Sequence, residues 1–107
     1  MLWYLSTYIP LMYAIAFDLD MESLKIAYHN DSYTNAYGEI RTFLKSKGFE
    51  NQPGSVYFGN AKVNAVSCVM AAVEMSKALP WFAASVRDIR MLRIEEFNDL
   101  KPAVDSV

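Results

Sequence analysis

Hydrophobic and polar positions predict a strand followed by a helix in the first half of the chain. Residues 13–19 (YAIAFDL) form a short apolar run closed by the acidic Asp18 and Asp20, a pattern typical of a buried strand. Residues 21–29 mix polar and apolar positions, so we expect a connector there with at most a short turn of helix. The cluster at 30–32 (NDS) consists of residues that favour a helix N-cap.

The segment after this cluster has the spacing of an amphipathic helix. Charged residues such as Glu39, Arg41 and Lys45 are suited to its solvent-facing side, and Gly48 supplies the expected C-terminal stop. Its apolar residues recur every three or four positions: Tyr33, Ala36, Tyr37, Ile40, Phe43 and Leu44.

A hairpin and a second helix follow. Residues 49–52 and 55–59 flank Pro53-Gly54, which is strong turn punctuation and predicts two paired strands. Asn60 is the candidate cap of the next helix, which we expect to be well buried and to end at Leu79, before Pro80. The predicted apolar stripe comprises Val63, Val66, Met70 and Val73, widened by Cys68, Val69 and Ala72.

The last quarter of the chain predicts one more strand. We expect a loose turn over residues 81–84, and a partly loose tail from Asn98, which includes Pro102. Residues 87–96 (RDIRMLRIEE) place charged and apolar residues close together, as a strand with two used faces does. A helix remains the alternative there, because three residues also fit its period: Ile89, Leu92 and Arg93.

The order strand, helix, strand, strand, helix, strand predicts an α+β fold of the ferredoxin-like βαββαβ type, with two helices on one face of an antiparallel sheet. In that arrangement the sheet order is 4-1-3-2, so the first strand is central and antiparallel to both neighbours. The C-terminal end of the first strand then meets the starts of the third and fourth strands. We interpret residues 12–107 as a single domain of this type.

The first eleven residues are interpreted as an N-terminal extension, with Met12 as the usual start. Residues 1–17 carry no charge, but a signal peptide needs Lys or Arg before its apolar stretch. An apolar segment of this length interrupted by Pro10 is also marginal for a membrane helix. We therefore expect a cytoplasmic protein without a membrane partner.

Composition narrows the classes of function. With 107 residues, of which 53% are hydrophobic and 21% charged, the chain is typical of one globular domain. The formal net charge of −2 argues against a protein that coats nucleic acid by bulk electrostatics, although a local group of arginines can still engage RNA. The single Cys68 excludes an intramolecular disulfide, and with only one histidine a zinc site of the usual composition is not formed within one chain.

The predicted topology brings five candidate residues to one edge of the sheet: Asp18 from the first strand, Ser55 from the third, and Arg87, Asp88 and Arg90 from the fourth. A carboxylate there can activate a 2′-hydroxyl or a water, or hold a divalent cation such as Mg²⁺. A serine hydroxyl can orient a phosphate oxygen, and an arginine guanidinium is suited to grip a phosphate. Together these residues are suited to phosphodiester cleavage.

Structural roles stay open for each of these residues. An aspartate after a strand commonly caps a turn, and Ser55 after Gly54 fits an ordinary turn residue. Asp88 and the arginines also fit a surface ion pair, which stabilises a fold little. His29, the only histidine, lies in a polar loop, where a catalytic role is the less favoured interpretation. Tyr57 is a candidate for stacking on an RNA base, although core or interface packing is the more common role.

Four stretches of the chain closely resemble the virulence-associated protein D family. They start at Met12 (MYAIAFDLD), Asn35 (NAYGEIRTFLKSKGFE), Gln52 (QPGSVYF) and Ser85 (SVRDIRMLRIEEFNDL). The similarity spans residues 12–104 and makes Met12 look like the family's own N-terminus.

The resemblance implies a ferredoxin-like fold, a homodimer and kinship with the small endoribonuclease-like subunit of CRISPR adaptation systems. It also implies a bacterial endoribonuclease, in some members the toxin of a toxin–antitoxin pair, so an antitoxin protein is an expected partner. By position, the family's site residues correspond to Asp18, Ser55 and Asp88. In a homodimer, two copies of Asp18 would approach each other and share a cation or perturb each other's titration. We expect no DNA substrate.

Three functions therefore compete. The first is an endoribonuclease that cleaves single-stranded RNA, with Asp18 as base or metal ligand, and with Arg87, Arg90 and Tyr57 binding the RNA. The second is a ferredoxin-like module that binds RNA or a protein without cutting, which the acidic net charge favours. The third is an interaction module that dimerises through an open sheet face. A cleavage assay separates the first from the others.

Overall fold

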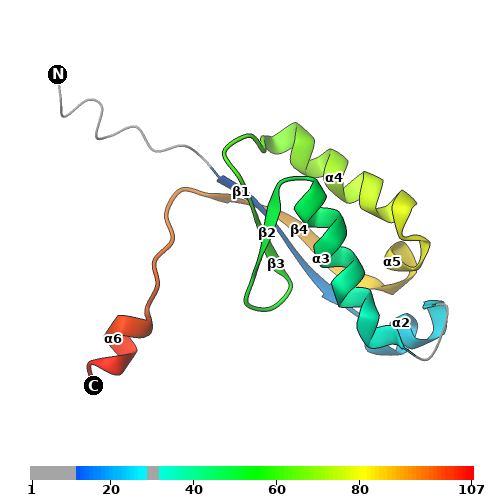
Figure 1. The fold of residues 1–107 in the computed structure, drawn as a ribbon, viewed down its shortest axis with the longest axis horizontal. Helices are drawn as coiled ribbons and strands as arrows, with labels where there is room; N and C mark the ends of the chain where they lie inside the picture. Colours follow the sequence, from blue (N-terminus) through cyan, green and yellow to red (C-terminus); the bar gives the residue numbers. More distant parts are fainter. Residues whose placement is uncertain (1–11, 29–31) are drawn as a thin grey trace.

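The computed structural model of the protein describes residues 12–28 and 32–107 (Figure 1). Within these residues the chain forms a four-stranded antiparallel sheet and five α-helices, which confirms the α+β class. In chain order the elements are β1 (Met12–Leu19), α2 (Met21–Ala27), the 3-10 helix η1 (Tyr33–Asn35), α3 (Ala36–Ser46), β2 (Phe49–Gln52), β3 (Val56–Gly59), α4 (Ala65–Ala78), α5 (Pro80–Ser85), β4 (Val86–Ile94) and α6 (Lys101–Asp105).

β1 is a central strand. The sheet order is β2-β3-β1-β4, and β1 is antiparallel to both of its neighbours, as predicted. The backbone N–H of Phe17 donates to the carbonyl of Ser55 at 3.1 Å, and Asp18 lies opposite Asp88 in the β1–β4 register. The C-terminal end of β1 therefore meets the starts of β3 and β4, which was the geometric basis of the predicted site.

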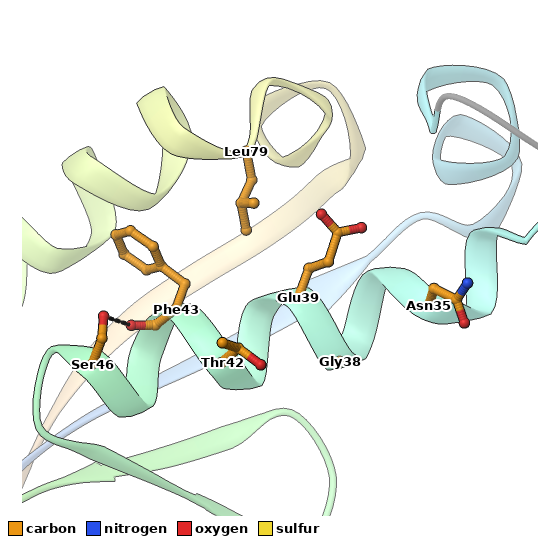
Figure 2. Close-up of a pocket in the computed structure, with 7 residues that line it drawn as sticks. All are labelled: Asn35, Gly38, Glu39, Thr42, Phe43, Ser46 and Leu79. Atoms are coloured by element: carbon orange, nitrogen blue, oxygen red, sulfur yellow. Dashed lines mark hydrogen bonds between the residues drawn. The ribbon is translucent and has the colours of Figure 1, made fainter.

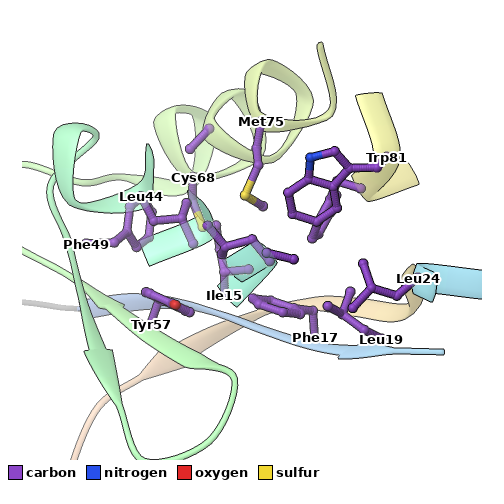
Figure 3. Packing of buried hydrophobic residues seen from close by; sticks show 14 of the residues in the cluster. Ile15, Phe17, Leu19, Leu24, Leu44, Phe49, Tyr57, Cys68, Met75 and Trp81 are labelled. Carbon is purple, nitrogen blue, oxygen red and sulfur yellow. The ribbon is translucent and has the colours of Figure 1, made fainter. Parts of the chain in front are cut away.

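The core lies between the sheet and the helices α3, α4 and α5, which cover one face of it (Figures 1 and 3). Figure 3 shows Ile15, Phe17 and Leu19 of β1 on the side of the strand that faces the helices, with Leu24 of α2 beside Leu19. These β1 residues alternate along the strand, so one side of β1 is buried against the helices. Burial of this apolar surface holds the helices on the sheet.

The opposite side of the sheet, which we call the open face, carries the intervening residues. Ala14 lies in register between Phe58 of β3 and Leu92 of β4, and these larger side chains share its face. The ring of Phe97, in the segment after β4, contacts Phe58 edge-on with 5.1 Å between the ring centroids. Since side chains alternate along β1, Asp18 also belongs to the open face.

The hairpin and the buried side of the first long helix match the sequence prediction. Ala36, Ile40 and Leu44 form the buried side of α3. Gly48 after this helix has φ +91°, and Gly54 in the β2–β3 turn has φ +77°, conformations that glycine adopts without a steric penalty.

The prediction of a connector at 21–29 is wrong for most of this segment. Residues Met21–Ala27 form the helix α2, because Asp20 caps its N-terminus by accepting a hydrogen bond from the backbone N–H of Ser23. The next helix also begins later than predicted. Ser32 starts the 3-10 turn η1, and α3 begins only at Ala36, without a side-chain cap. The predicted cap residues Asn30 and Asp31 lie outside the described residues.

Two predictions for α4 are wrong. Its N-cap is Asn64, which forms a reciprocal capping box with Ser67, whereas the Asn60 side chain accepts from the backbone N–H of Lys62. Of the predicted stripe, Val63 is buried ahead of the helix and Cys68 is buried within it, as expected, but four helical members are exposed: Val66, Val69, Met70 and Val73. The helix is apolar on both sides, and it turns the smaller Cys68 and Ala71, together with Met75, toward the core. Small side chains let α4 approach the sheet closely, which explains why the side that carries Cys68 and Ala71 faces the core.

Two further segments are more ordered than the sequence predicted. Pro80 ends α4 at Ala78, as expected, but it also occupies the first turn of α5, where proline is favoured. Trp81 and Phe82 of α5 are buried, so this turn is part of the core. β4 confirms the strand interpretation of the 87–96 region, and the tail contains the short helix α6. Among the described residues, no helix combines the length and apolar character needed to cross a bilayer.

A pair of glycine substitutions tests the positive-φ stop of α3. Gly48→Ala places a Cβ at φ +91° and 2.9 Å from Nδ2 of Asn60, so we expect the free energy of unfolding to fall by about 1–2 kcal/mol. Gly38→Ala lies inside α3, where nothing stands within 4 Å of the added Cβ, and should raise it by about 0.5–1 kcal/mol. Urea unfolding followed by circular dichroism measures both. Equal stabilities of the two variants would contradict this account.

Candidate functional site

The end of β1 and the start of β4 place two carboxylates opposite each other. Asp18 and Asp88 are register partners, and their side chains are 62% and 51% exposed. Phe17 and Leu19, on either side of Asp18, are buried toward the helices, so Asp18 projects to the open face. Like charges directly opposite each other in a sheet are destabilising unless cations lie nearby. Two arginines supply that charge.

Arg87 reaches Asp18 because the β1–β4 register shifts at this point. Asp18 pairs with Asp88, but the next residue, Leu19, pairs with Val86, so Arg87 is the extra residue of a β-bulge. In a regular strand Arg87 would point to the face opposite Asp88, and bulges re-aim side chains in this way. Its Nη1 lies 3.5 Å from Oδ2 of Asp18.

Asp20 holds the other end of the same guanidinium. Its Oδ1 accepts a hydrogen bond from Nη2 of Arg87 at 2.8 Å, while its Oδ2 accepts from the backbone N–H of Ser23 at 3.1 Å. The Ser23 hydroxyl bond, and then the Arg87 bond, lower the pKa of the Asp20 carboxyl below its ordinary 3.8. Asp20, followed by Asp18, raises the pKa of the Arg87 guanidinium, so both partners stay charged at neutral pH.

Asp88 is bound by the second arginine. The Nε of Arg90 donates to both carboxylate oxygens of Asp88, at 3.0 and 3.2 Å. Arg90 lies two residues further along β4 and opposite Ala16, so it belongs to the open face as well. The side chain of Arg90 is 72% exposed, which makes the pair accessible to a ligand.

The structure thus brings together four of the predicted residues: Asp18, Arg87, Asp88 and Arg90. Ser55 joins them through its backbone, because its carbonyl accepts from Phe17, the residue before Asp18. Ser55 itself lies in the turn before β3 rather than within the strand.

Tyr57, one of the predicted RNA-binding residues, lies in the core and not on the surface. It is 3% exposed, and its ring stacks on Phe17 with the centroids 5.9 Å apart. Burial raises the pKa of its phenol. A ring held in this core position cannot stack on a base. His29, the less favoured catalytic candidate, lies outside the described residues.

Asp20 was missed as a contributor to this cluster. Because residues 21–29 were predicted to be a connector, Asp20 was assigned only to the end of the first strand and not to the start of a helix. The signal was present in the spacing of Asp20 and Ser23, which is typical of a side-chain cap at the start of a helix.

A cation site is not assembled by one described chain. Within residues 12–28 and 32–107, no group of three or more His, Cys, Asp or Glu side chains converges on one point. The carboxylates near Asp18 are already paired with Arg87 and Arg90. Divalent cations such as Mg²⁺ prefer several oxygen ligands with few competing positive charges. The donors that the described part of one chain gathers near Asp18 therefore do not fit such a cation.

A separate groove lies on the helical side of the molecule (Figure 2). Figure 2 shows side chains of α3 beside Leu79, which lies between α4 and α5. The groove has a volume of about 650 Å³, and none of the predicted site residues lines it. The lining residues are Asn35, Gly38, Glu39, Thr42, Phe43, Ser46 and Leu79. The carboxylate–arginine cluster is thus an exposed edge of the sheet and not part of this groove.

Comparison with known proteins identifies close relatives. The chain is 48% identical over 93 residues to endoribonuclease VapD 2 of Riemerella anatipestifer, covering 87% of this chain and 99% of the relative. It is 46% identical over 99 residues to an endoribonuclease VapD homolog of Helicobacter pylori, covering 90% and 99%. Endoribonuclease VapD of Dichelobacter nodosus is 42% identical over 93 residues, covering 87% and 97%. No family model matches the chain.

The lowered pKa of Asp20 gives the cluster a defined acid sensitivity. A carboxyl with a lowered pKa stays ionised above its ordinary 3.8, so the α2 cap and the Arg87 pair persist there and are lost as pH falls through the lowered value. An NMR titration of the Ser23 amide should show a midpoint below 3.8. Ser23→Ala removes the largest cause and should move the midpoint upward. A midpoint at or above the ordinary value in the unsubstituted chain would contradict the described pairing.

Proposed function

This chain belongs to the endoribonuclease VapD family, and from that membership we propose that it is an endoribonuclease that cleaves single-stranded RNA. The observation that carries the proposal is the contact of Asp18 with Arg87 on an exposed edge of the sheet. A carboxylate beside a guanidinium provides a proton acceptor and an anion-binding group close enough to act on the same phosphodiester.

In the proposed reaction Asp18 is the general base. Its carboxylate accepts the proton of the attacking hydroxyl, either the ribose 2′-OH or a water, as that oxygen forms a bond to phosphorus. The bond from phosphorus to the leaving 5′-oxygen breaks, and that oxygen takes a proton from solvent. Arg87 and Arg90 bind the phosphate oxygens and stabilise the charge that develops on them. The end groups of the product distinguish the two nucleophiles, because 2′-OH attack leaves a 2′,3′-cyclic phosphate.

Ser55 and Asp88 have supporting roles in this proposal. The Ser55 carbonyl fixes the backbone next to Asp18, and its hydroxyl would orient a phosphate oxygen. Asp88 holds Arg90 through both of its carboxylate oxygens. Since residues 12–28 and 32–107 of one chain do not gather three His, Cys, Asp or Glu ligands at one point, no step of the reaction is assigned here to a metal.

We also propose that the open face is the contact surface of a homodimer. Leu92, which is 41% exposed, lies on this face in register with the buried Ala14, whose partner on the other side is Phe58 of the Phe58–Phe97 ring pair. Apolar side chains exposed on a sheet favour burial against a second sheet. Because Asp18 is on the same face, dimerisation would bring two copies of the site toward each other.

The remaining features of the proposal follow from the fold and the relatives. Read from the β4 edge, the strand order is β4-β1-β3-β2, which supports a ferredoxin-like assignment for the domain at 12–107. We propose a toxin-type, cytoplasmic role with an antitoxin protein as partner, in keeping with the family resemblance of the sequence.

A non-catalytic RNA- or protein-binding module is the second candidate. The observation in its favour is that both site arginines are already paired with carboxylates, in a chain of net charge −2. Such a module would bind RNA with Asp18 unchanged or substituted.

Cleavage of RNA by an Asp18→Asn variant tests the base. The amide keeps the shape of the side chain but accepts no proton, so we expect the rate to fall by about 10²–10⁴-fold. A parallel reaction in EDTA shows whether cleavage by the unsubstituted chain requires a divalent cation. Single-stranded RNA with a labelled 5′ end gives the rate from the appearance of shorter products.

Glu74→Gln is the matched control, since it removes a carboxylate that is 44% exposed on α4, on the helical side of the molecule and away from the open face. Its rate should stay within about twofold of the unsubstituted chain, as expected for surface changes away from a site. Equal cleavage by Asp18→Asn would reject Asp18 as the base. Binding without cleavage by every variant would favour the second candidate.

The dimer proposal is tested by placing one charge on either face of β4. Leu92→Glu puts an unpaired carboxylate on the open face and should raise the dimer dissociation constant by more than about 10-fold. Met91→Glu changes the neighbouring residue, which is 44% exposed and in register with Ile15 on the helical side, and should leave the dimer intact. Analytical ultracentrifugation measures both. A monomeric unsubstituted chain, or equal dissociation of the two variants, would refute this interface.

A further inference from the structure

Asp20 divides its two oxygens between a helix and an arginine. Oδ2 accepts from both the backbone N–H and the hydroxyl of Ser23, at 3.1 and 2.5 Å, so α2 fixes the carboxylate in place. Oδ1 is left to Arg87 Nη2 at 2.8 Å. The Asp20 side chain is 35% exposed, compared with 62% for Asp18 and 62% for Arg87. Of the three charged groups, Asp20 is the one that is anchored.

Arg87 has a long side chain whose position must be set by its partners. It is mostly exposed, and freely rotating side chains of this kind sample many rotamers. Two different nitrogens meet the two carboxylates: Nη2 lies close to Asp20, and Nη1 lies at 3.5 Å from Asp18. The short contact is the one to Asp20. Asp20 therefore determines where the guanidinium lies, and Asp18 is approached without being tightly hydrogen-bonded.

The unequal contacts of Arg87 with Asp20 and Asp18 matter if Asp18 is the general base. If Asp20 did not hold Arg87, the nearest carboxylate to the guanidinium would be Asp18, and a bidentate pair would occupy the oxygens that must accept the proton. The alternative is that Arg87 swings into solvent and no longer meets the phosphate. Both outcomes slow cleavage. Arg90 does not replace it, because its Nε is bound to Asp88.

We infer that Asp20 is a positioning residue for the cleavage reaction: it holds the Arg87 guanidinium beside Asp18 so that the arginine meets the phosphate while the Asp18 carboxylate stays free to take the proton. The inference rests on the proposed function. It adds a residue at the start of α2 to the site and assigns the cap of this helix a role in orienting the reaction.

Asp20→Asn separates this role from helix capping. Asparagine is as good an N-cap as aspartate, so α2 and the thermal midpoint should be retained, but the charge that holds Arg87 is lost. We expect kcat to fall by roughly 5–20-fold with KM changed by less than about twofold, since orientation in the transition state is lost more than ground-state binding. Asp99→Asn is the matched control. That side chain also accepts a hydrogen bond from a backbone N–H, that of Lys101 at 2.9 Å, and has no arginine contact among the described residues.

A double substitution tests whether Asp20 acts through Arg87. Asp20→Asn in an Arg87→Ala background should produce no further loss of kcat, because the group that it positions is absent. The Arg87 Nε–H signal in NMR spectra should broaden or shift in Asp20→Asn and stay unchanged in Asp99→Asn. An additive loss in the double variant, or an unchanged kcat in Asp20→Asn with intact folding, would overturn the inference.

The outcomes also separate this inference from the proposed function. If Asp18→Asn cleaves as well as the unsubstituted chain, the assignment of the base fails, whatever Asp20 does. If Asp18→Asn is inactive and Asp20→Asn is fully active, only the positioning role is rejected. A loss in both, with the double variant equal to Arg87→Ala, supports the two together.

Discussion

The antiparallel pairing of β1 with β4 is the contact on which both the core and the candidate site depend. Its register decides that Ile15 and Phe17 enter the core while Asp18 and Arg90 share the open face. A slip of one residue would exchange these faces, burying charge and exposing apolar side chains. The large energetic penalty of that exchange fixes the register, and the register in turn fixes the site.

The bulge at Arg87 is the one point where this alternation is broken. Everywhere else along β4 the residues that face the helices and the open face alternate strictly. At the bulge an additional residue enters the strand, so two consecutive residues, Arg87 and Asp88, both contribute to the cluster around Asp18. These exposed ion pairs stabilise the fold little, so their significance lies in the geometry that they impose.

Part of this arrangement was predictable because strand order and burial patterns are encoded locally. The apolar run at 13–19, the Pro53-Gly54 turn and the strand pattern at 87–96 were enough to bring Asp18, Ser55 and Asp88 to one edge. The burial of α4 was not predictable in the same way, because both of its sides are apolar and the choice depends on how closely Cys68 and Ala71 pack on the sheet. The bulge and the capping role of Asp20 also depend on tertiary contacts: a pairing register in one case, a neighbouring arginine in the other.

The net charge of the chain and the charges within the candidate site have different consequences for RNA binding. A net charge of −2 provides no long-range attraction for RNA, yet the local balance of charge in the cluster is set by a few contacts of 2.8–3.5 Å. A phosphate arriving at Arg87 competes with the longer contact to Asp18 before it competes with the shorter one to Asp20. Binding of the substrate would then release the Asp18 carboxylate from its cation at the moment when a proton acceptor is required. Under the proposed function, the pairing of Arg87 with Asp18 in the free chain is thus also the feature that would prepare the site to react.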